Sequence, residues 1–132
     1  MKAKLKERKI TDIEVGSAGI AALDDLTPTQ ETINVMTEKN IDVSAHQSRQ
    51  LKKEMIENAD LILAMSDIHK EEVLRKSPEA KGKVFLLKSY GVYSDESGMN
   101  IPDPIGKPME AYEVCRNTIE EAVDRVMKKI LP

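Results

Sequence analysis

The stretch Leu61-Ile62-Leu63-Ala64-Met65 is an unbroken apolar run between Asp60 and Ser66. Such a run is typical of a strand that is covered on both faces, as in a parallel sheet flanked by helices. A second run of this kind, Val84-Phe85-Leu86-Leu87, follows after a helical pattern. Because parallel strands need a crossover connection between them, the two runs predict an α/β fold with a mostly parallel sheet.

Helices are predicted before, between and after these two strands. Thr27-Pro28-Thr29-Gln30 predicts a helix start, with Thr27 as N-cap and Pro28 in the first helical position, and Asn40 ends that helix. Two more helices are expected over residues 52–57 and from a Ser66-Asp67 cap to about Lys76. The terminal helix is predicted by apolar residues at helical spacing, namely Tyr112, Cys115, Ile119, Ala122, Val126 and Ile130.

The N-terminal residues predict a short basic helix followed by a short strand. Residues 2–9 contain good helix formers and basic side chains of the kind that suit a helix C-terminus. Ile13-Glu14-Val15 alternates as a strand does, and Gly16-Ser17-Ala18-Gly19 follows it as a turn of small residues. Much later in the chain, the segment from Tyr90 to Asn100 shows no periodicity and is predicted to be a mobile loop.

Composition predicts one domain over residues 1–132 and excludes several classes of function. Charged residues make up 33% of the chain at a net charge of -3, with Lys and Arg scattered, which argues against nucleic-acid binding. No signal peptide and no membrane-spanning window is found, so we expect a soluble cytoplasmic protein. One cysteine, Cys115, excludes an internal disulfide, and the two histidines, His46 and His69, are too few to suggest zinc. No metal or organic cofactor is therefore expected.

The stretch Ile101-Pro102-Asp103-Pro104-Ile105-Gly106 is the candidate for chemistry. Pro102 has a fixed φ, and Pro104 pushes Asp103 toward an extended conformation. Gly106 then allows a turn with positive φ. A carboxylate held in this way is either a turn acceptor or a placed catalytic acid, and composition alone favours the turn.

Four stretches in this order resemble the low-molecular-weight protein tyrosine phosphatase family, and the match covers essentially all of the chain. They are Val15-Gly16-Ser17-Ala18-Gly19, in which Gly16 departs from the family pattern, residues 41–51 with Ser44-Ala45-His46 and Ser48-Arg49-Gln50, Ala59-Asp60-Leu61-Ile62-Leu63-Ala64-Met65, and Pro102-Asp103-Pro104-Ile105-Gly106. The resemblance implies a three-layer fold with a four-stranded parallel sheet between helices. It also implies a Cys-x5-Arg phosphate loop whose thiolate attacks phosphorus while an Asp-Pro aspartate protonates the leaving group.

The resemblance assigns roles to three residues of this chain. It implies that Asp103 is the general acid, and that Ser17 and His46 belong to a hydrogen-bond network behind the phosphate loop. Without the resemblance, Ser17 is a plain turn residue and His46 a solvated loop histidine. The substrate implied is a phosphorylated protein.

The side chains around the substrate leave its class open between phosphotyrosine and phosphoarginine. Ile105 and Gly106 stand where eukaryotic members carry aromatics that flank a phosphotyrosine ring, which resembles bacterial members, including those acting on phosphoarginine. The residue that separates the two specificities lies in the phosphate loop. Tyr90 and Tyr93 are interpreted either as the lining of a substrate cleft or as solvent-facing loop residues.

The Cys-x5-Arg motif does not occur in these 132 residues. The residue six places after Cys115 is Glu121, so we interpret Cys115 as a small buried hydrophobe and expect no nucleophile in this chain. The resemblance implies that the family's central first strand, its phosphate loop and most of its first helix, roughly 25 residues, would precede Met1. Without that strand its neighbours are left unpaired, which would weaken independent folding and offer open sheet edges for self-association.

Three hypotheses for function follow. In the first, the chain is an N-terminally truncated form of a complete phosphatase and does not hydrolyse phosphomonoesters by itself, because the nucleophile and anion cradle are missing. In the second, it is a non-catalytic pseudophosphatase that acts as an interaction module. A third, arsenate reductase on the same fold, needs further cysteines in the middle of the chain, and the surroundings of Ala64 contain none.

Overall fold

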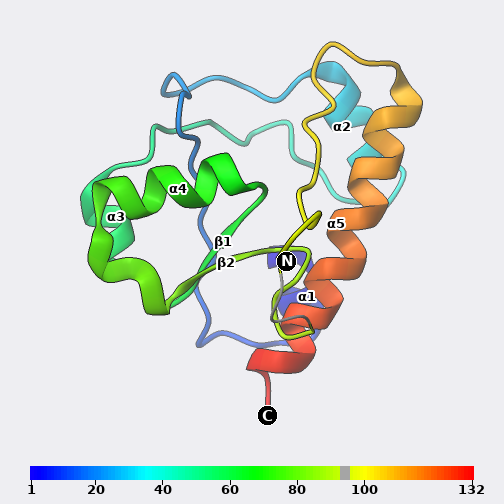
Figure 1. The fold of residues 1–132 in the computed structure, drawn as a ribbon. Helices are drawn as coiled ribbons and strands as arrows, with labels where there is room; N and C mark the ends of the chain where they lie inside the picture. Colours follow the sequence, from blue (N-terminus) through cyan, green and yellow to red (C-terminus); the bar gives the residue numbers. More distant parts are fainter. Residues whose placement is uncertain (93–95) are drawn as a thin grey trace. The chain divides into compact units, whose positions relative to one another are not determined.

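The computed structural model describes residues 1–92 and 96–132, and Tyr93, considered above for a substrate cleft, lies outside them. The chain folds as two compact parts, Met1–Gln50 and Leu51–Pro132 (Figure 1). The single domain over residues 1–132 stays a prediction. None of the helices in the described ranges is long and apolar enough to cross a membrane.

The second part contains the predicted parallel sheet. Strand β1 (Ile62–Ala64) pairs in parallel with β2 (Val84–Leu86), and Leu63 lies opposite Phe85. The crossover between them contains α4 (Asp67–Lys76) and a 3-10 helix, η1 (Pro78–Gly82). This pairing confirms that both apolar runs form strands of a parallel sheet. Their apolar side chains suit such strands, because helices cover a parallel sheet.

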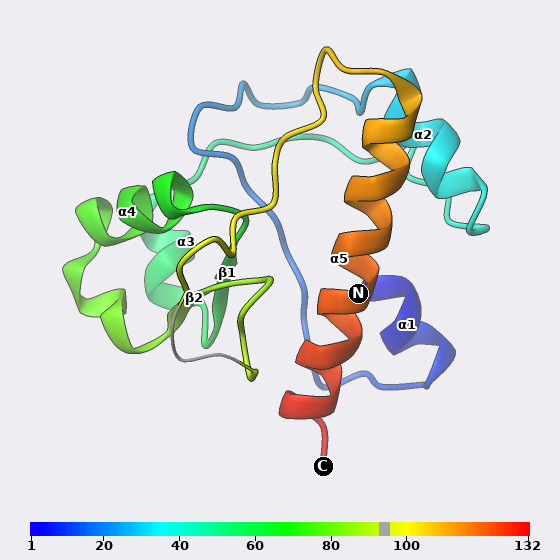
Figure 2. The same ribbon diagram turned by 45° about the vertical axis from the view of Figure 1, so that its right-hand side comes forward.

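The core of the second part lies between the strands and the helices around them. The short helix α3 (Lys53–Asn58) contributes Ile56, α4 contributes Val73, η1 contributes Ala80 and β2 contributes Val84, and all four are at most 4% exposed. Figures 1 and 2 show α3 and α4 on one side of the two strands and α5 (Met109–Ile130) on the other. This arrangement is the α/β layering that the sequence predicts.

The terminal helix α5 buries a broader face than its sequence pattern indicates. Tyr112, Ala122 and Val126 are buried as predicted, whereas Cys115 is only half-buried. Two residues outside the predicted set, Val123 and Met127, are also buried. They extend the stripe formed by Ala122 and Val126 by one position around the helix, since residues four apart share a face.

The first part contains two short helices, α1 (Lys2–Glu7) and α2 (Gln30–Thr37), in the regions predicted to be helical. The N-cap of α2 is Thr29, however, and not Thr27. The Thr29 hydroxyl oxygen accepts a hydrogen bond from the backbone N–H of Thr32 at 3.2 Å, so the helix begins two residues later than its Pro28 signal suggests. The helix ends as predicted before Asn40, which has a φ of 58°.

The predicted strand Ile13-Glu14-Val15 does not form in the described structure, where these residues belong to no helix or strand. The sheet of the described residues contains β1 and β2 only. A strand is defined by the backbone hydrogen bonds it shares with a neighbour, so alternation of side chains is not sufficient to make one.

Candidate active site

The loop that carries Asp103 starts from a fixed point at the carboxyl end of β1. The backbone N–H of Ile101 donates a hydrogen bond to the carbonyl oxygen of Met65, the residue after β1, at 2.8 Å. Ile101 is buried, at 5% exposure, whereas Asp103 two residues later is exposed. Burial of one residue and the fixed φ of Pro102 thus hold the base of the loop while the carboxylate faces outward.

Asp103 is a turn acceptor, which was one of its two interpretations. Its Oδ1 accepts a hydrogen bond from the backbone N–H of Ile105 at 3.0 Å, which is an Asx turn. A second turn follows, in which the N–H of Lys107 donates to the carbonyl of Pro104 at 3.0 Å and Gly106 takes a φ of 75°. The positive φ predicted for Gly106 is confirmed. Because the carboxylate is exposed, its role in the turn is compatible with a role as acid.

The side chain of Asn100, the residue before Ile101, makes a second attachment near the same point. Asn100 Oδ1 accepts a hydrogen bond from the backbone N–H of Asp67, in the first turn of α4, at 2.9 Å. Ser66 occupies the N-cap position as predicted, but its side chain caps no backbone N–H and lies 3.1 Å from Nδ1 of His69 instead. Sequence patterns locate caps within a few residues of a helix, so they did not find a cap that lies 33 residues away.

Glu96 lies at the start of the segment that leads to Asn100, and its carboxylate contacts three groups. The sequence did not single it out. Its carboxylate accepts hydrogen bonds from the backbone N–H of Leu86 at 2.6 Å and from the Ser89 hydroxyl at 3.1 Å, and it pairs with the Lys70 ammonium group of α4. Burial would raise the pKa of Glu96, but the bonds from Lys70, Leu86 and Ser89 together lower it. The carboxylate is therefore charged and internally paired.

Ser17 and His46 both belong to the first part of the chain, where they are exposed. The carbonyl oxygen of Ser17 accepts a hydrogen bond from Nε of Arg49 at 2.8 Å, and the backbone N–H of His46 donates to the carbonyl of Val43 at 3.0 Å. Within the described residues, no hydrogen bond joins the two side chains to each other. Their supporting role behind a phosphate loop stays a prediction.

The Ser48-Arg49-Gln50 stretch organises the loop that contains Ser17. The Ser48 hydroxyl donates to the carbonyl of Leu23 at 2.5 Å and accepts from the N–H of Leu26 at 3.1 Å. Gln50 Nε2 donates to the carbonyl of Ile20 at 2.7 Å. Three consecutive polar side chains therefore fix residues 17–26 through backbone groups, which is why this stretch is polar yet structured.

The guanidinium group of Arg49 lies close to the backbone at Gly16. A Cβ built at Gly16 would be 2.6 Å from Nη2 of Arg49. Glycine leaves room here for the arginine that donates to the carbonyl of Ser17, and a larger residue would displace the flexible end of that arginine.

Cys115 has the properties of a structural thiol. Burial raises its pKa, and the nearby Asp103 carboxylate raises it further. A raised pKa leaves less of the nucleophilic thiolate at neutral pH, which is the opposite of what a phosphatase cysteine needs. Residue 121 is Glu, so no Cys-x5-Arg sequence begins at Cys115, and the absence of a nucleophile from this chain stays a prediction.

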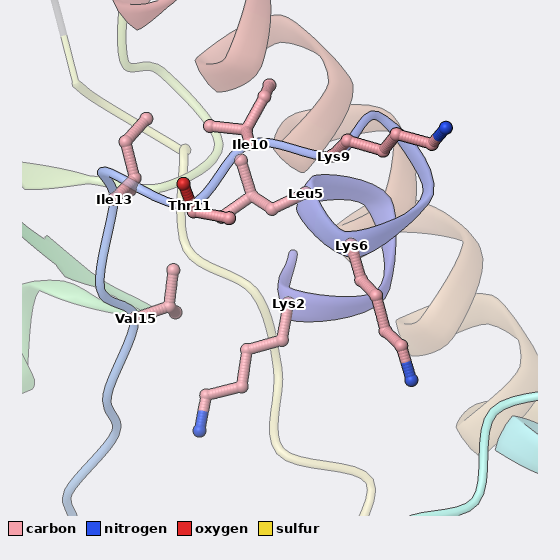
Figure 3. Close-up of a pocket in the computed structure, with 8 residues that line it drawn as sticks. All are labelled: Lys2, Leu5, Lys6, Lys9, Ile10, Thr11, Ile13 and Val15. Atoms are coloured by element: carbon pink, nitrogen blue, oxygen red, sulfur yellow. The ribbon is translucent and has the colours of Figure 1, made fainter.

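Two pockets in the described residues are lined by none of the predicted site residues. One, of about 270 Å³ in the first part of the chain, gathers Leu5, Ile10 and Ile13, while the ammonium groups of Lys6 and Lys9 point away from these apolar side chains (Figure 3). The other, of about 240 Å³, lies beside α5 and includes Arg125, whose Nη2 donates to the carbonyl of Lys88 at 3.2 Å. In the described part of the chain, no three His, Cys, Asp or Glu side chains cluster to hold a metal ion.

Comparison with known proteins identifies the family. Residues 1–131 match the family model of the low molecular weight phosphotyrosine protein phosphatases. The protein-arginine-phosphatase of Geobacillus stearothermophilus is 38% identical over 128 residues, which cover 97% of this chain and 84% of that protein.

Solved structures agree with this match in fold. The low molecular weight protein tyrosine phosphatase from T. tengcongensis is 30% identical with a TM-score of 0.86, and the match covers 97% of this chain and 84% of that one. A variant of the YwlE arginine phosphatase with a phosphorylated active-site serine in place of cysteine is 30% identical with a TM-score of 0.85, over 97% of this chain and 82% of that one. The chain therefore belongs to the low molecular weight phosphotyrosine protein phosphatase family.

Proposed function

We propose that this chain carries the general acid of a low molecular weight protein phosphatase, and that Asp103 is that acid. The observation that carries the proposal is the exposed Asp103 carboxylate two residues beyond the hydrogen bond from Ile101 N–H to Met65 O, at the carboxyl end of β1. Proteins with an open parallel sheet bind their ligands at the carboxyl ends of the strands. The substrate would be a phosphorylated side chain of a protein.

The chemistry divides between this acid and a Cys-x5-Arg loop. The thiolate of that loop would form a sulfur–phosphorus bond as the bond from phosphorus to the leaving atom breaks, and Asp103 would donate its proton to that atom. Water would then attack phosphorus and give a proton to the Asp103 carboxylate, while the sulfur–phosphorus bond breaks to return the thiolate and release phosphate. The YwlE variant with a phosphorylated serine supports a phosphoenzyme route for the family. The 132 residues contain the acid without a Cys-x5-Arg sequence, so this chain alone would have no turnover.

The test compares the chain alone with a fusion. The 132-residue chain should not hydrolyse p-nitrophenyl phosphate. A fusion to the N-terminal segment of the Geobacillus stearothermophilus relative, including the family's phosphate loop, should hydrolyse it. In that fusion, Asp103→Asn should lower kcat by about 100-fold to 10,000-fold, as expected for loss of a general acid.

Asp60→Asn serves as the control, because Asp60 is an exposed carboxylate beside the same strand and has no part in the proposed chemistry. An active fusion whose kcat is unchanged by D103N would overturn the role of Asp103. Turnover by the pure 132-residue chain would overturn the claim that the chain lacks its own nucleophile, and loss of that turnover in Cys115→Ser would identify Cys115 as the nucleophile.

A non-catalytic interaction module is the second candidate, favoured by the missing Cys-x5-Arg sequence. It would bind a partner protein or a second copy of the chain through open sheet edges. Sedimentation of the purified chain at increasing concentration tests the second copy, since a single monomeric species at all concentrations would exclude self-association.

A further inference from the structure

We propose that Asn100 is a positioning residue for Asp103, which it holds in place by capping α4. The inference rests on the proposed function of Asp103 as general acid. Its structural part concerns only hydrogen bonds within the second part of the chain, so it can be measured without any enzymatic activity.

The cap of α4 comes from a residue that is distant in the sequence. The first N–H groups of a helix have no partner within the helix and need one from outside it. The N-cap residue Ser66 makes no side-chain bond of this kind, and the N–H of Asp67 donates to Asn100 Oδ1 at 2.9 Å. Asn100 therefore does for α4 what a neighbouring serine usually does.

The residue that caps α4 is followed directly by the residue that bonds to the end of β1. Asn100 binds Asp67, and the next residue, Ile101, donates its backbone N–H to the carbonyl of Met65 at 2.8 Å. Two consecutive residues are thus attached to a three-residue segment at the end of β1. Only Pro102, with its fixed φ, separates this double attachment from Asp103. Loss of the Asn100 bond would leave the Ile101 bond as the single attachment of these two residues to the end of β1.

The segment leading to Asn100 is fixed at its other end as well. Glu96 accepts hydrogen bonds from Leu86 N–H and Ser89, and pairs with Lys70 on α4. A turn follows, in which the N–H of Met99 donates to the carbonyl of Glu96 at 3.1 Å. Residues 96–101 are therefore held against α4 at both ends, and the Asn100 bond is the attachment nearer to Asp103.

Asn100 is an exposed residue, which makes it suitable for substitution. Asn100→Ala removes the acceptor without opening a cavity in the core. Asn100→Asp keeps an acceptor oxygen at the same position, and a carboxylate is also favourable at a helix N-terminus. Asn117→Ala is the matched control, because Asn117 is also exposed but bonds to its neighbour Arg116 within α5.

The experiment measures amide hydrogen exchange in the 132-residue chain at Asp67, Ile101 and Ile105, with Phe85 in β2 as the gauge of the sheet. N100A should accelerate exchange at the first three amides by about fivefold, the factor expected for loss of one helix cap. Exchange at Phe85 should not change. The exchange rates of these amides in N100D should match those in the parent chain within about twofold, and N117A should not change them.

Three outcomes would overturn the proposal. Acceleration at Asp67 alone would mean that Asn100 caps the helix without holding the loop. Equal acceleration at Phe85 would mean that it stabilises the whole second part. An N100D chain that behaves like N100A would mean that the acceptor oxygen is not what matters.

A kinetic readout in the fusion described above separates this inference from the proposed function. N100A should lower kcat about tenfold with KM unchanged, and N100D should restore it, because misplacement of an acid affects the chemical step. If D103N has no effect on kcat, the proposed function is wrong, whatever the exchange data show. If D103N lowers kcat but N100A does not, Asp103 is the acid and the positioning role of Asn100 is wrong.

Discussion

The backbone N–H of Asp67 donates a hydrogen bond to Oδ1 of Asn100, which lies 33 residues further along the chain, at 2.9 Å. This bond joins the first turn of α4 to the segment that leads to Asp103. A cap supplied from so far away stabilises the helix and locates the loop at the same time. The candidate acid is thereby held by the same helix that covers the parallel strands.

Glu96 should give the chain a pH-dependent stability. Its pKa in the folded chain lies below the ordinary value of 4.5, because three hydrogen-bond donors outweigh its burial. A depressed folded pKa means that the stabilisation is fully present above about pH 4.5 and is lost as the pH falls through the folded pKa. Glu96→Gln should lower the free energy of unfolding at pH 7 by about 2 kcal/mol, the range for hydrogen bonds to a charged group.

Urea unfolding at pH 7 and at low pH measures this effect. The difference between the parent chain and E96Q should shrink on acidification. Glu71→Gln, which changes an exposed carboxylate on α4, should shift stability by less than about 0.5 kcal/mol at either pH. A difference for E96Q that is independent of pH would argue against the charge of Glu96 as its cause.

Cys115 should react slowly with alkylating reagents. Its raised pKa reduces the thiolate fraction at pH 8, so iodoacetamide should modify it more slowly than it modifies a cysteine in an unstructured peptide. Because the Asp103 charge contributes to the raised pKa, Asp103→Asn should accelerate the reaction, whereas Asp60→Asn should not. Equal rates in the parent chain and D103N would show that burial alone protects the thiol.

Thr29, and not Thr27, should stabilise α2. Thr29→Ala removes the acceptor of the Thr32 N–H and should lower the free energy of unfolding by about 1 kcal/mol. Thr27→Ala removes an exposed threonine two residues before the cap, and should cost less than about 0.5 kcal/mol. Urea unfolding of the two variants side by side tests this pair, and a larger loss from T27A would restore the cap that the sequence suggested.

Ser48 should hold the loop of residues 17–26. Ser48→Ala removes one hydroxyl that donates to the carbonyl of Leu23 and accepts from the N–H of Leu26, so it should cost about 1 kcal/mol and speed amide exchange at Leu26. Ser44→Ala, which removes a bond to Asp42 only two residues away, should leave Leu26 unchanged. Unaltered exchange at Leu26 in S48A would show that the backbone bonds suffice.

Local sequence patterns predicted much of the fold. The apolar runs at residues 61–65 and 84–87 predicted both strands of the sheet, since strands covered on both faces need apolar side chains at every position. The alternation at Ile13-Val15 predicted a strand that is not formed, because a strand also needs a partner that no local pattern specifies. The Thr27-Pro28 signal located α2 but not its first residue, since two threonines could serve as cap.

For the candidate site, the sequence by itself determined the chemical groups: a carboxylate between two prolines, a single cysteine, and no Cys-x5-Arg sequence. These follow from composition and from the restricted φ of proline, which act within a few residues. Only the tertiary structure decided that Ile101 is fixed to Met65, that Asn100 caps α4, and that Glu96 is paired with Lys70. Each of these bonds joins residues 26 or more apart in the chain, and their partners are chosen by how the strands and helices pack.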